Sequence, residues 1–193
     1  MIGITGAGGA GKTTFGKNIE RYYGPENCIS IDLDDYLLSR EARGKLEVSG
    51  YNPQANKLFL ARKNIEDLKA GKIIQKPVYN HSTGNVLSDE TVAPRELLIV
   101  EGVTTLYPEL AELNDISFFL DAQEETQIKS RIKRDVTERG YTLEEALALF
   151  HALKPDYERF IAPTKDKASI IVSVGPDYIM HPLHIDPKFK QSL

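Results

Sequence analysis

The chain lacks several features that mark particular classes of protein. It contains one cysteine, Cys28, among its 193 residues, and 24 basic residues against 28 acidic ones, a net charge of −4. A single thiol excludes a disulfide framework and a cysteine-based zinc site within one chain. No apolar run reaches the length of about 18 residues that a membrane span needs. Since binding long nucleic acid requires a broad basic surface, we expect neither a nucleic-acid partner nor a membrane association.

The length and composition predict one folded domain. A chain of 193 residues with 41% hydrophobic and 27% charged residues can bury a sizeable core, which excludes a mainly disordered state. The start, Met1–Thr5, lacks the basic residues of a signal peptide and reads as a strand. We therefore expect a cytoplasmic protein whose single domain covers residues 1–193.

Short apolar runs alternate with helical patterns along most of the chain. This alternation predicts an α/β fold with a mostly parallel five-stranded sheet. Helices are predicted at 12–23, 54–70, 123–139 and 143–153, the last preceded by a capping box of Thr142 and Glu145. The predicted strands are Met1–Thr5, Asn27–Ile31, Leu97–Val100, Ile116–Leu120 and Ser169–Val174.

Two segments interrupt the alternation. Residues 72–94 contain short extended runs broken by Pro77 and by a turn-forming stretch, which predicts a small β-hairpin insert. Residues 175–193 form a proline-containing tail that we expect to lie along the surface.

The most specific signal is a glycine-rich segment after the first strand. It fits the pattern G-x-x-x-x-G-K-[ST], in which backbone N–H groups and a helix N-terminus cradle phosphates. In this pattern the lysine neutralises β- and γ-phosphate oxygens, and the hydroxyl of the next residue can bind Mg²⁺. The predicted nucleotide-binding residues are Gly6, Ala7, Gly8, Gly9, Ala10, Gly11, Lys12, Thr13 and Thr14.

A phosphate-binding loop of this type identifies a nucleoside triphosphate site rather than a reaction. The chain shows neither the N-K-x-D element of GTPases nor the L-S-G-G-Q signature of ABC-type ATPases. A small kinase that transfers a phosphoryl group is therefore favoured.

The sequence resembles the uridine kinase/phosphoribulokinase family of P-loop kinases from the loop to about Val174. The resemblance implies a three-layer P-loop NTPase fold, ATP and Mg²⁺ as nucleotide and metal, a small-molecule alcohol as acceptor, and possible self-association. Besides the loop, the segments that carry it are residues 31–36, 50–53, 76–79, 98–102, 131–140 and 162–165. Of these, Arg131–Gly140 matches a recurrent R-x-x-R-D-x-x-x-R-G string.

Carboxylates follow two of the predicted strands. Asp32, Asp34 and Asp35 come after one strand, at the sheet edge where ligands bind in α/β folds, and one of them is expected to orient the acceptor hydroxyl. The resemblance favours Asp34 as the catalytic carboxylate, with Asp32 and Asp35 as alternatives. Glu101 ends another strand and is expected to hold Mg²⁺ together with Thr13.

The basic segment 123–155 is interpreted as a helical lid over the triphosphate. Arginine forks suit phosphate oxygens, although a charged run can also be a solvated helix face. The resemblance assigns ATP contacts to Arg131, Arg134 and Arg139, and we count Arg134 with Lys12 and Asp34 as catalytic.

The acceptor pocket departs from the uridine kinase pattern. The resemblance implies that the insert covers this pocket, which Tyr36, Tyr51, Asn52, Tyr79 and His81 would line. Asn52 stands where uridine kinases have an aspartate, and Tyr141 and Leu149 replace an arginine and a glutamine. The leading hypothesis is transfer to the 5′-hydroxyl of uridine or cytidine. Alternatives are a sugar phosphate, glycerate or pantothenate-like acceptor, or a nucleotide-binding regulator without turnover.

Overall fold

A computed structural model of the protein describes residues 1–189. Its main helices are α1 (Lys12–Tyr23), α2 (Arg40–Lys45), α3 (Leu58–Lys69), α4 (Glu124–Arg139) and α5 (Leu143–Asp156). Its strands are β1 (Ile2–Gly6), β2 (Cys28–Asp32), β3 (Ile74–Lys76), β4 (Tyr79–Asn80), β5 (Asn85–Val86), β6 (Glu90–Val92), β7 (Leu97–Glu101), β8 (Ile116–Ala122), β9 (Ile170–Val174) and β10 (Met180–Ile185).

The central sheet has six strands in the order β10-β9-β8-β1-β7-β2. All pairs among β2, β7, β1, β8 and β9 are parallel, and these are the five strands predicted from the sequence. Since β1 lies in the interior of the sheet, the loop that follows it is flanked by the ends of β7 and β8.

The prediction of five strands is wrong, because β10, within the predicted tail, adds a sixth strand at the sheet edge, with residues 181–184 exposed. This segment pairs antiparallel with β9 and shifts register between Pro182 and His184. A proline is tolerated on an edge strand because its missing N–H need not pair with a neighbour. The proline and the polar histidines interrupt the apolar pattern by which a strand is recognised in the sequence. Of the predicted tail, residues 190–193 lie outside the described residues.

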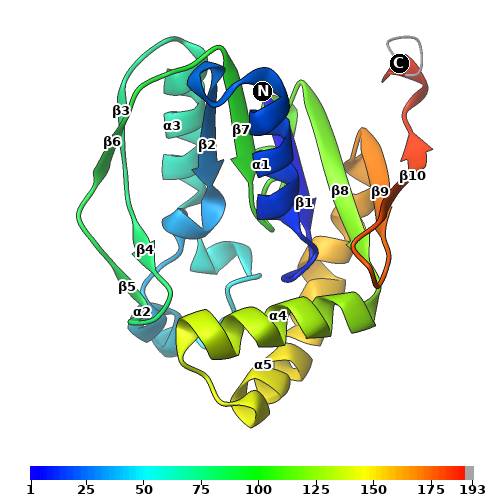
Figure 1. Ribbon diagram of the computed structural model, residues 1–193. Helices are drawn as coiled ribbons and strands as arrows, with labels where there is room; N and C mark the ends of the chain where they lie inside the picture. The colour runs from blue at the N-terminus through cyan, green and yellow to red at the C-terminus, as the bar shows by residue number, and fades with distance from the viewer. Residues whose placement is uncertain (190–193) are drawn as a thin grey trace.

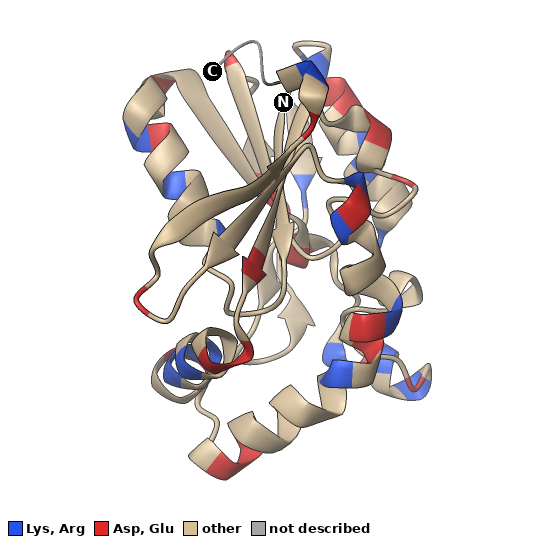
Figure 2. Cartoon of the chain, turned by 90° about the vertical axis from the view of Figure 1, so that its right-hand side faces the viewer, with Lys and Arg blue, Asp and Glu red and all other residues tan. Residues whose placement is uncertain are grey.

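Helices cover both faces of the sheet, which confirms the three-layer fold (Figure 1). On one face, Phe15 and Ile19 of α1 pack against a core that includes Ile4, Ile99 and Leu120. On the other face, Ala61, Ile65 and Leu68 of α3 join a larger core with residues of β2, β7 and the segment after β7. In Figure 2 the strands of the sheet are almost free of charged residues, which gather on the helices and at strand ends.

The sequence predicts four helices and one β-hairpin insert, and all but one of these five segments match the structure closely. α1, α4 and α5 lie where predicted, and Thr142 and Glu145 form the capping box. Residues 72–94 form an antiparallel ribbon, with β3 paired to β6 and β4 paired to β5. The third predicted helix begins later than expected, at Leu58, because the Asn52 side chain caps a separate turn, Pro53–Ala55. Along residues 1–189 no helix has the length and apolarity to cross a membrane.

Candidate active site

The glycine-rich loop connects β1 to α1 in a conformation that only glycine adopts readily. Gly6, Gly9 and Gly11 have φ angles of 138°, 86° and 89°. The Lys12 ammonium folds back onto the loop and donates to the carbonyls of Gly6 and Ala7, at 3.2 and 3.1 Å. Burial lowers the pKa of Lys12, and the negative charges of Asp34 and Glu101 oppose that shift. The loop thus holds a desolvated cation beside its backbone N–H groups, as phosphate binding requires.

Two oxygen groups meet at the first turn of α1. The Thr13 hydroxyl donates to a Glu101 carboxylate oxygen at 3.0 Å. Burial raises the pKa of Glu101, while Lys12 and Thr13 favour its charged form. Among the described residues no group of three or more His, Cys, Asp or Glu side chains could hold a metal ion. A hydroxyl and one carboxylate fit Mg²⁺ that takes its other ligands from phosphates and water.

The three aspartates after β2 have different environments. Asp35 accepts hydrogen bonds from the Lys76 ammonium and from the Tyr79 N–H, at 2.9 Å for the latter, and so anchors the ribbon 72–94. Asp32 accepts from the Asp34 N–H at 2.9 Å. Solvent reaches the Asp32 side chain, although protein surrounds it on most sides. This desolvation, together with the negative charges of Asp34 and Glu101, raises the pKa of Asp32 to about 8.

Asp34 is the aspartate of this group that lines the large cavity beside the loop. Its carboxylate lies 3.7 Å from Nε2 of His81. Burial, assisted by the positive charges of Arg139 and Arg134, lowers the pKa of His81 and favours its neutral form. Of the three candidates, Asp34 alone therefore combines access to the cavity with a carboxylate that is not committed to a lysine.

The lid arginines converge on one buried carboxylate. Asp135 is 0% exposed and accepts from Arg131 and Arg134 at 3.3 Å and from Arg139 at 3.2 Å. Burial and the charge of Arg134 lower the pKa of Arg139. This carboxylate holds all three predicted arginines on one side of α4.

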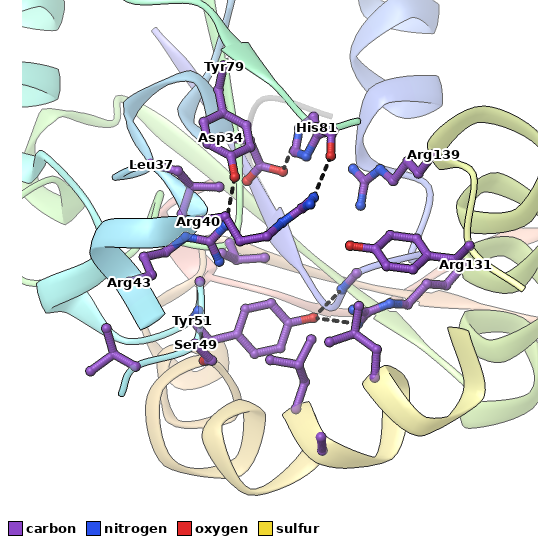
Figure 3. Close-up of a pocket in the computed structure, with 18 of the residues that line it drawn as sticks. Asp34, Leu37, Arg40, Arg43, Ser49, Tyr51, Tyr79, His81, Arg131 and Arg139 are labelled. Atoms are coloured by element: carbon purple, nitrogen blue, oxygen red, sulfur yellow. Dashed lines mark hydrogen bonds and ion pairs between the residues drawn. The ribbon is translucent and has the colours of Figure 1, made fainter. Parts of the chain in front are cut away.

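The cavity between these elements has a volume of about 490 Å³. Figure 3 shows Arg131 and Arg139 on one side of the cavity and Arg40 and Arg43 of α2 on the other, with Tyr79, Asp34 and His81 along the upper edge of the view. The side chains that line it include Lys12, Asp34, Leu37, Arg40, Arg43, Tyr51, Tyr79, His81, Arg131, Arg134, Arg139, Tyr141 and Leu149.

Three of the five residues predicted for the acceptor pocket line this cavity, namely Tyr51, Tyr79 and His81. The prediction for Tyr36 is corrected, because its side chain is 1% exposed in the core and its hydroxyl accepts from Asn64 at 3.0 Å. Asn52 does not line the cavity, and its side chain accepts from the Gln54 N–H at 3.0 Å, so its role toward an acceptor stays a prediction.

Sequence reasoning missed α2 and its two arginines. Arg40 donates to the His81 carbonyl at 2.9 Å, and Arg43 donates to the Leu38 carbonyl at 3.2 Å and to the Tyr79 hydroxyl at 2.7 Å. A signal was present, because Ser39 is a good N-cap and two arginines three residues apart share a helix face. The helix is only six residues long, and so its periodicity is weak.

The parallel sheet, the glycine-rich loop and the arginine-bearing helix define a P-loop nucleotide-binding protein of the kinase type. Residues 1–180 match the phosphoribulokinase/uridine kinase family, and the chain belongs to that family. The resemblance seen in the sequence is thereby confirmed.

Individual relatives carry both names of the family. The chain is 40% identical over 178 residues to a phosphoribulokinase of Synechocystis sp., covering 91% of this chain and 54% of that protein. It is 38% identical over 183 residues to a uridine kinase of Clostridium perfringens, covering 91% and 87%. The solved structure of the Rhodobacter spheroides phosphoribulokinase superposes with a TM-score of 0.70 at 19% identity. The match covers 91% of this chain and 70% of that one, and it supports the fold. The chain thus spans about half the length of its curated phosphoribulokinase relatives.

Proposed function

We propose that this protein is an ATP-dependent kinase that phosphorylates a hydroxyl group of a sugar phosphate. The observation that carries the proposal is the pair Arg40 and Arg43 on the cavity side opposite the lid arginines (Figure 3). This choice reverses the order of the two acceptor classes expected from the sequence, where a nucleoside came first.

The two α2 arginines have no acidic partner in the described part of the chain. Their hydrogen bonds go to two backbone carbonyls and one tyrosine hydroxyl, and within residues 1–189 neither forms a salt bridge. Guanidinium groups bind phosphate with charge-assisted, often bidentate hydrogen bonds. A phosphate on the acceptor would balance these charges, whereas a neutral nucleoside would leave them uncompensated.

The remaining residues supply the parts of phosphoryl transfer to an alcohol. The loop and Lys12 would hold the triphosphate, and Arg131, Arg134 and Arg139 would stabilise the charge that spreads over the transferred group. Asp34 would orient the acceptor hydroxyl and take its proton. Thr13 and Glu101 would hold Mg²⁺, which neutralises phosphate charge when bound.

A nucleoside remains the second candidate acceptor. The uridine kinase relatives are covered over most of their length, 87% for the Clostridium perfringens protein. The rings of Tyr79 and His81 form an edge-to-face pair 5.0 Å apart at the cavity wall, and such a wall suits an aromatic base.

An acceptor panel tests the proposal. Formation of ADP from ATP and Mg²⁺ is followed with a pentulose phosphate, glycerate, pantothenate, uridine and cytidine. We expect turnover with the sugar phosphate, and a higher KM for it in Arg40→Gln and Arg43→Gln with little change in the KM for ATP. Turnover of uridine alone would overturn the sugar-phosphate assignment. Nucleotide binding without turnover of any acceptor would favour a regulatory protein.

A further inference from the structure

The hydroxyl of Tyr51 lies at the junction of the glycine-rich loop and the lid. It accepts a hydrogen bond from the Gly8 N–H at 3.2 Å and another from Nη1 of Arg131 at 3.3 Å. Figure 3 shows the Tyr51 ring with its hydroxyl directed toward Arg131. Tyr51 was expected to contact the acceptor, but these contacts place its polar end on the nucleotide side.

The hydroxyl still has a proton to donate. A phenol oxygen accepts up to two hydrogen bonds and donates one. Both acceptor positions are used here, and in the part of the chain that the structure describes the proton has no protein acceptor. Because Tyr51 lines the cavity, this donor is available to a bound ligand.

The position of the hydroxyl identifies which ligand group it would meet. Of the glycine-rich loop, Gly8 and Lys12 line the cavity that contains Asp34. The phosphoryl group in transit must lie between the loop and Asp34, since it leaves the nucleotide on one side and meets the acceptor oxygen on the other. A hydroxyl bonded to Gly8 therefore stands at the terminal phosphate rather than at the α- or β-phosphate.

The backbone that carries Tyr51 is held firmly. The Tyr107 hydroxyl donates to the Tyr51 carbonyl, and the Asn56 amide donates to the carbonyls of Gly50 and Asn52 at 3.1 and 2.9 Å. A Cβ atom on Gly8 would lie 2.9 Å from the Tyr51 oxygen, so a side chain at position 8 would displace the hydroxyl. The ring is thus positioned before any ligand arrives.

We propose that Tyr51 binds the γ-phosphate of ATP. Its hydroxyl holds Arg131 against the loop and donates a hydrogen bond to an oxygen of the terminal phosphoryl group. This inference rests on the proposed kinase function and adds a residue on the triphosphate side. It makes the Tyr51 hydroxyl specific for nucleotides that carry a third phosphate.

Binding of two nucleotides in the absence of acceptor tests the role. The Kd values of Mg·ADP and of the non-hydrolysable analogue Mg·AMP-PNP are measured for the wild type and for Tyr51→Phe. Loss of a hydrogen bond to a charged phosphate should weaken AMP-PNP about tenfold and leave ADP unchanged. Tyr178→Phe is the matched control, because its hydroxyl bonds Ser130 of α4 at 2.7 Å without touching the loop. Its ratio of the two Kd values should equal that of the wild type.

Equal weakening of both nucleotides in Tyr51→Phe would show a merely structural role, and an unchanged AMP-PNP affinity would exclude the contact. Either result overturns the inference but not the kinase proposal, whereas a wild type that binds neither nucleotide overturns both. If Tyr51→Phe loses its cooperative thermal transition, Gly8→Ala provides the test by displacing the hydroxyl from an intact tyrosine. Gly8→Ala should then reduce the preference for AMP-PNP over ADP, and an unchanged preference would overturn the inference.

Discussion

We expect the arrangement of the three α4 arginines to depend on the charge of Asp135, and replacing this residue by asparagine tests that dependence. The carboxylate is 0% exposed and bonds three guanidinium groups within 3.3 Å. Asparagine keeps the shape but leaves the three positive charges close together without a counter-charge. Removing one partner from a buried ionic cluster costs about 3–5 kcal/mol. We take the lower end, about 3 kcal/mol, because the Arg134 side chain is 35% exposed and solvent screens part of its charge.

For a domain of this size, about 3 kcal/mol corresponds to a fall in Tm of roughly 6–12 °C. Thermal unfolding followed by circular dichroism measures the fall, with Glu138→Gln on the exposed side of the same helix as the control. Inorganic tripolyphosphate should raise the Tm of Asp135→Asn more than that of the wild type, since it restores negative charge among the arginines. The reasoning is refuted if Asp135→Asn melts at the same temperature as Glu138→Gln.

Three further predictions follow from other parts of the site. Asp34→Asn should lower kcat by roughly 10²–10⁴-fold and leave the Kd of ATP unchanged, because it removes a proton acceptor rather than a phosphate contact; equal kcat values would exclude the role. Tyr36→Phe should lower the free energy of unfolding in urea by about 1 kcal/mol, through the lost bond to Asn64, without changing any acceptor KM; a raised KM would restore Tyr36 to the pocket. Because burial lowers the pKa of His81 from 6.5, the unfolded chain binds this proton more readily than the fold, so stability should fall as pH drops below 6.5. His81→Gln should flatten that slope between pH 7 and pH 5, and an unchanged slope would contradict the assignment.

Much of the fold could be predicted because its signals are local. The five parallel strands are short apolar runs, and the loop after β1 has a sequence pattern that phosphate binding requires. The capping box of Thr142 and Glu145 marks the start of α5. Each of these signals lies within about ten residues, so no long-range contact was needed to recognise it.

What escaped prediction depends on long-range contacts. Tyr36 follows two aspartates at the ligand-binding edge, and nothing local says that its ring turns into the core to meet Asn64. The strand β10 can be recognised only from its pairing with β9. Its proline argues against a strand unless the strand lies at a sheet edge, and its histidines interrupt the apolar pattern of a strand. The acidic cluster could be located but not divided into roles, since the distinction between Asp34 and Asp35 depends on Lys76, far along the chain.

The arrangement of charge in the cavity gives the strongest reason for an anionic acceptor. Five arginines line the cavity. The three from α4 share the buried Asp135, whereas the two from α2 have no carboxylate partner among residues 1–189. A triphosphate that binds along α4 would leave Arg40 and Arg43 on the opposite side of the cavity. Arg43 is half-buried and Arg40 is exposed, so an anion would replace water around both charges with charge-assisted hydrogen bonds. A second anion on the α2 side of the cavity would balance Arg40 and Arg43, and a hydroxyl of that anion could then meet Asp34 and the terminal phosphate of the first.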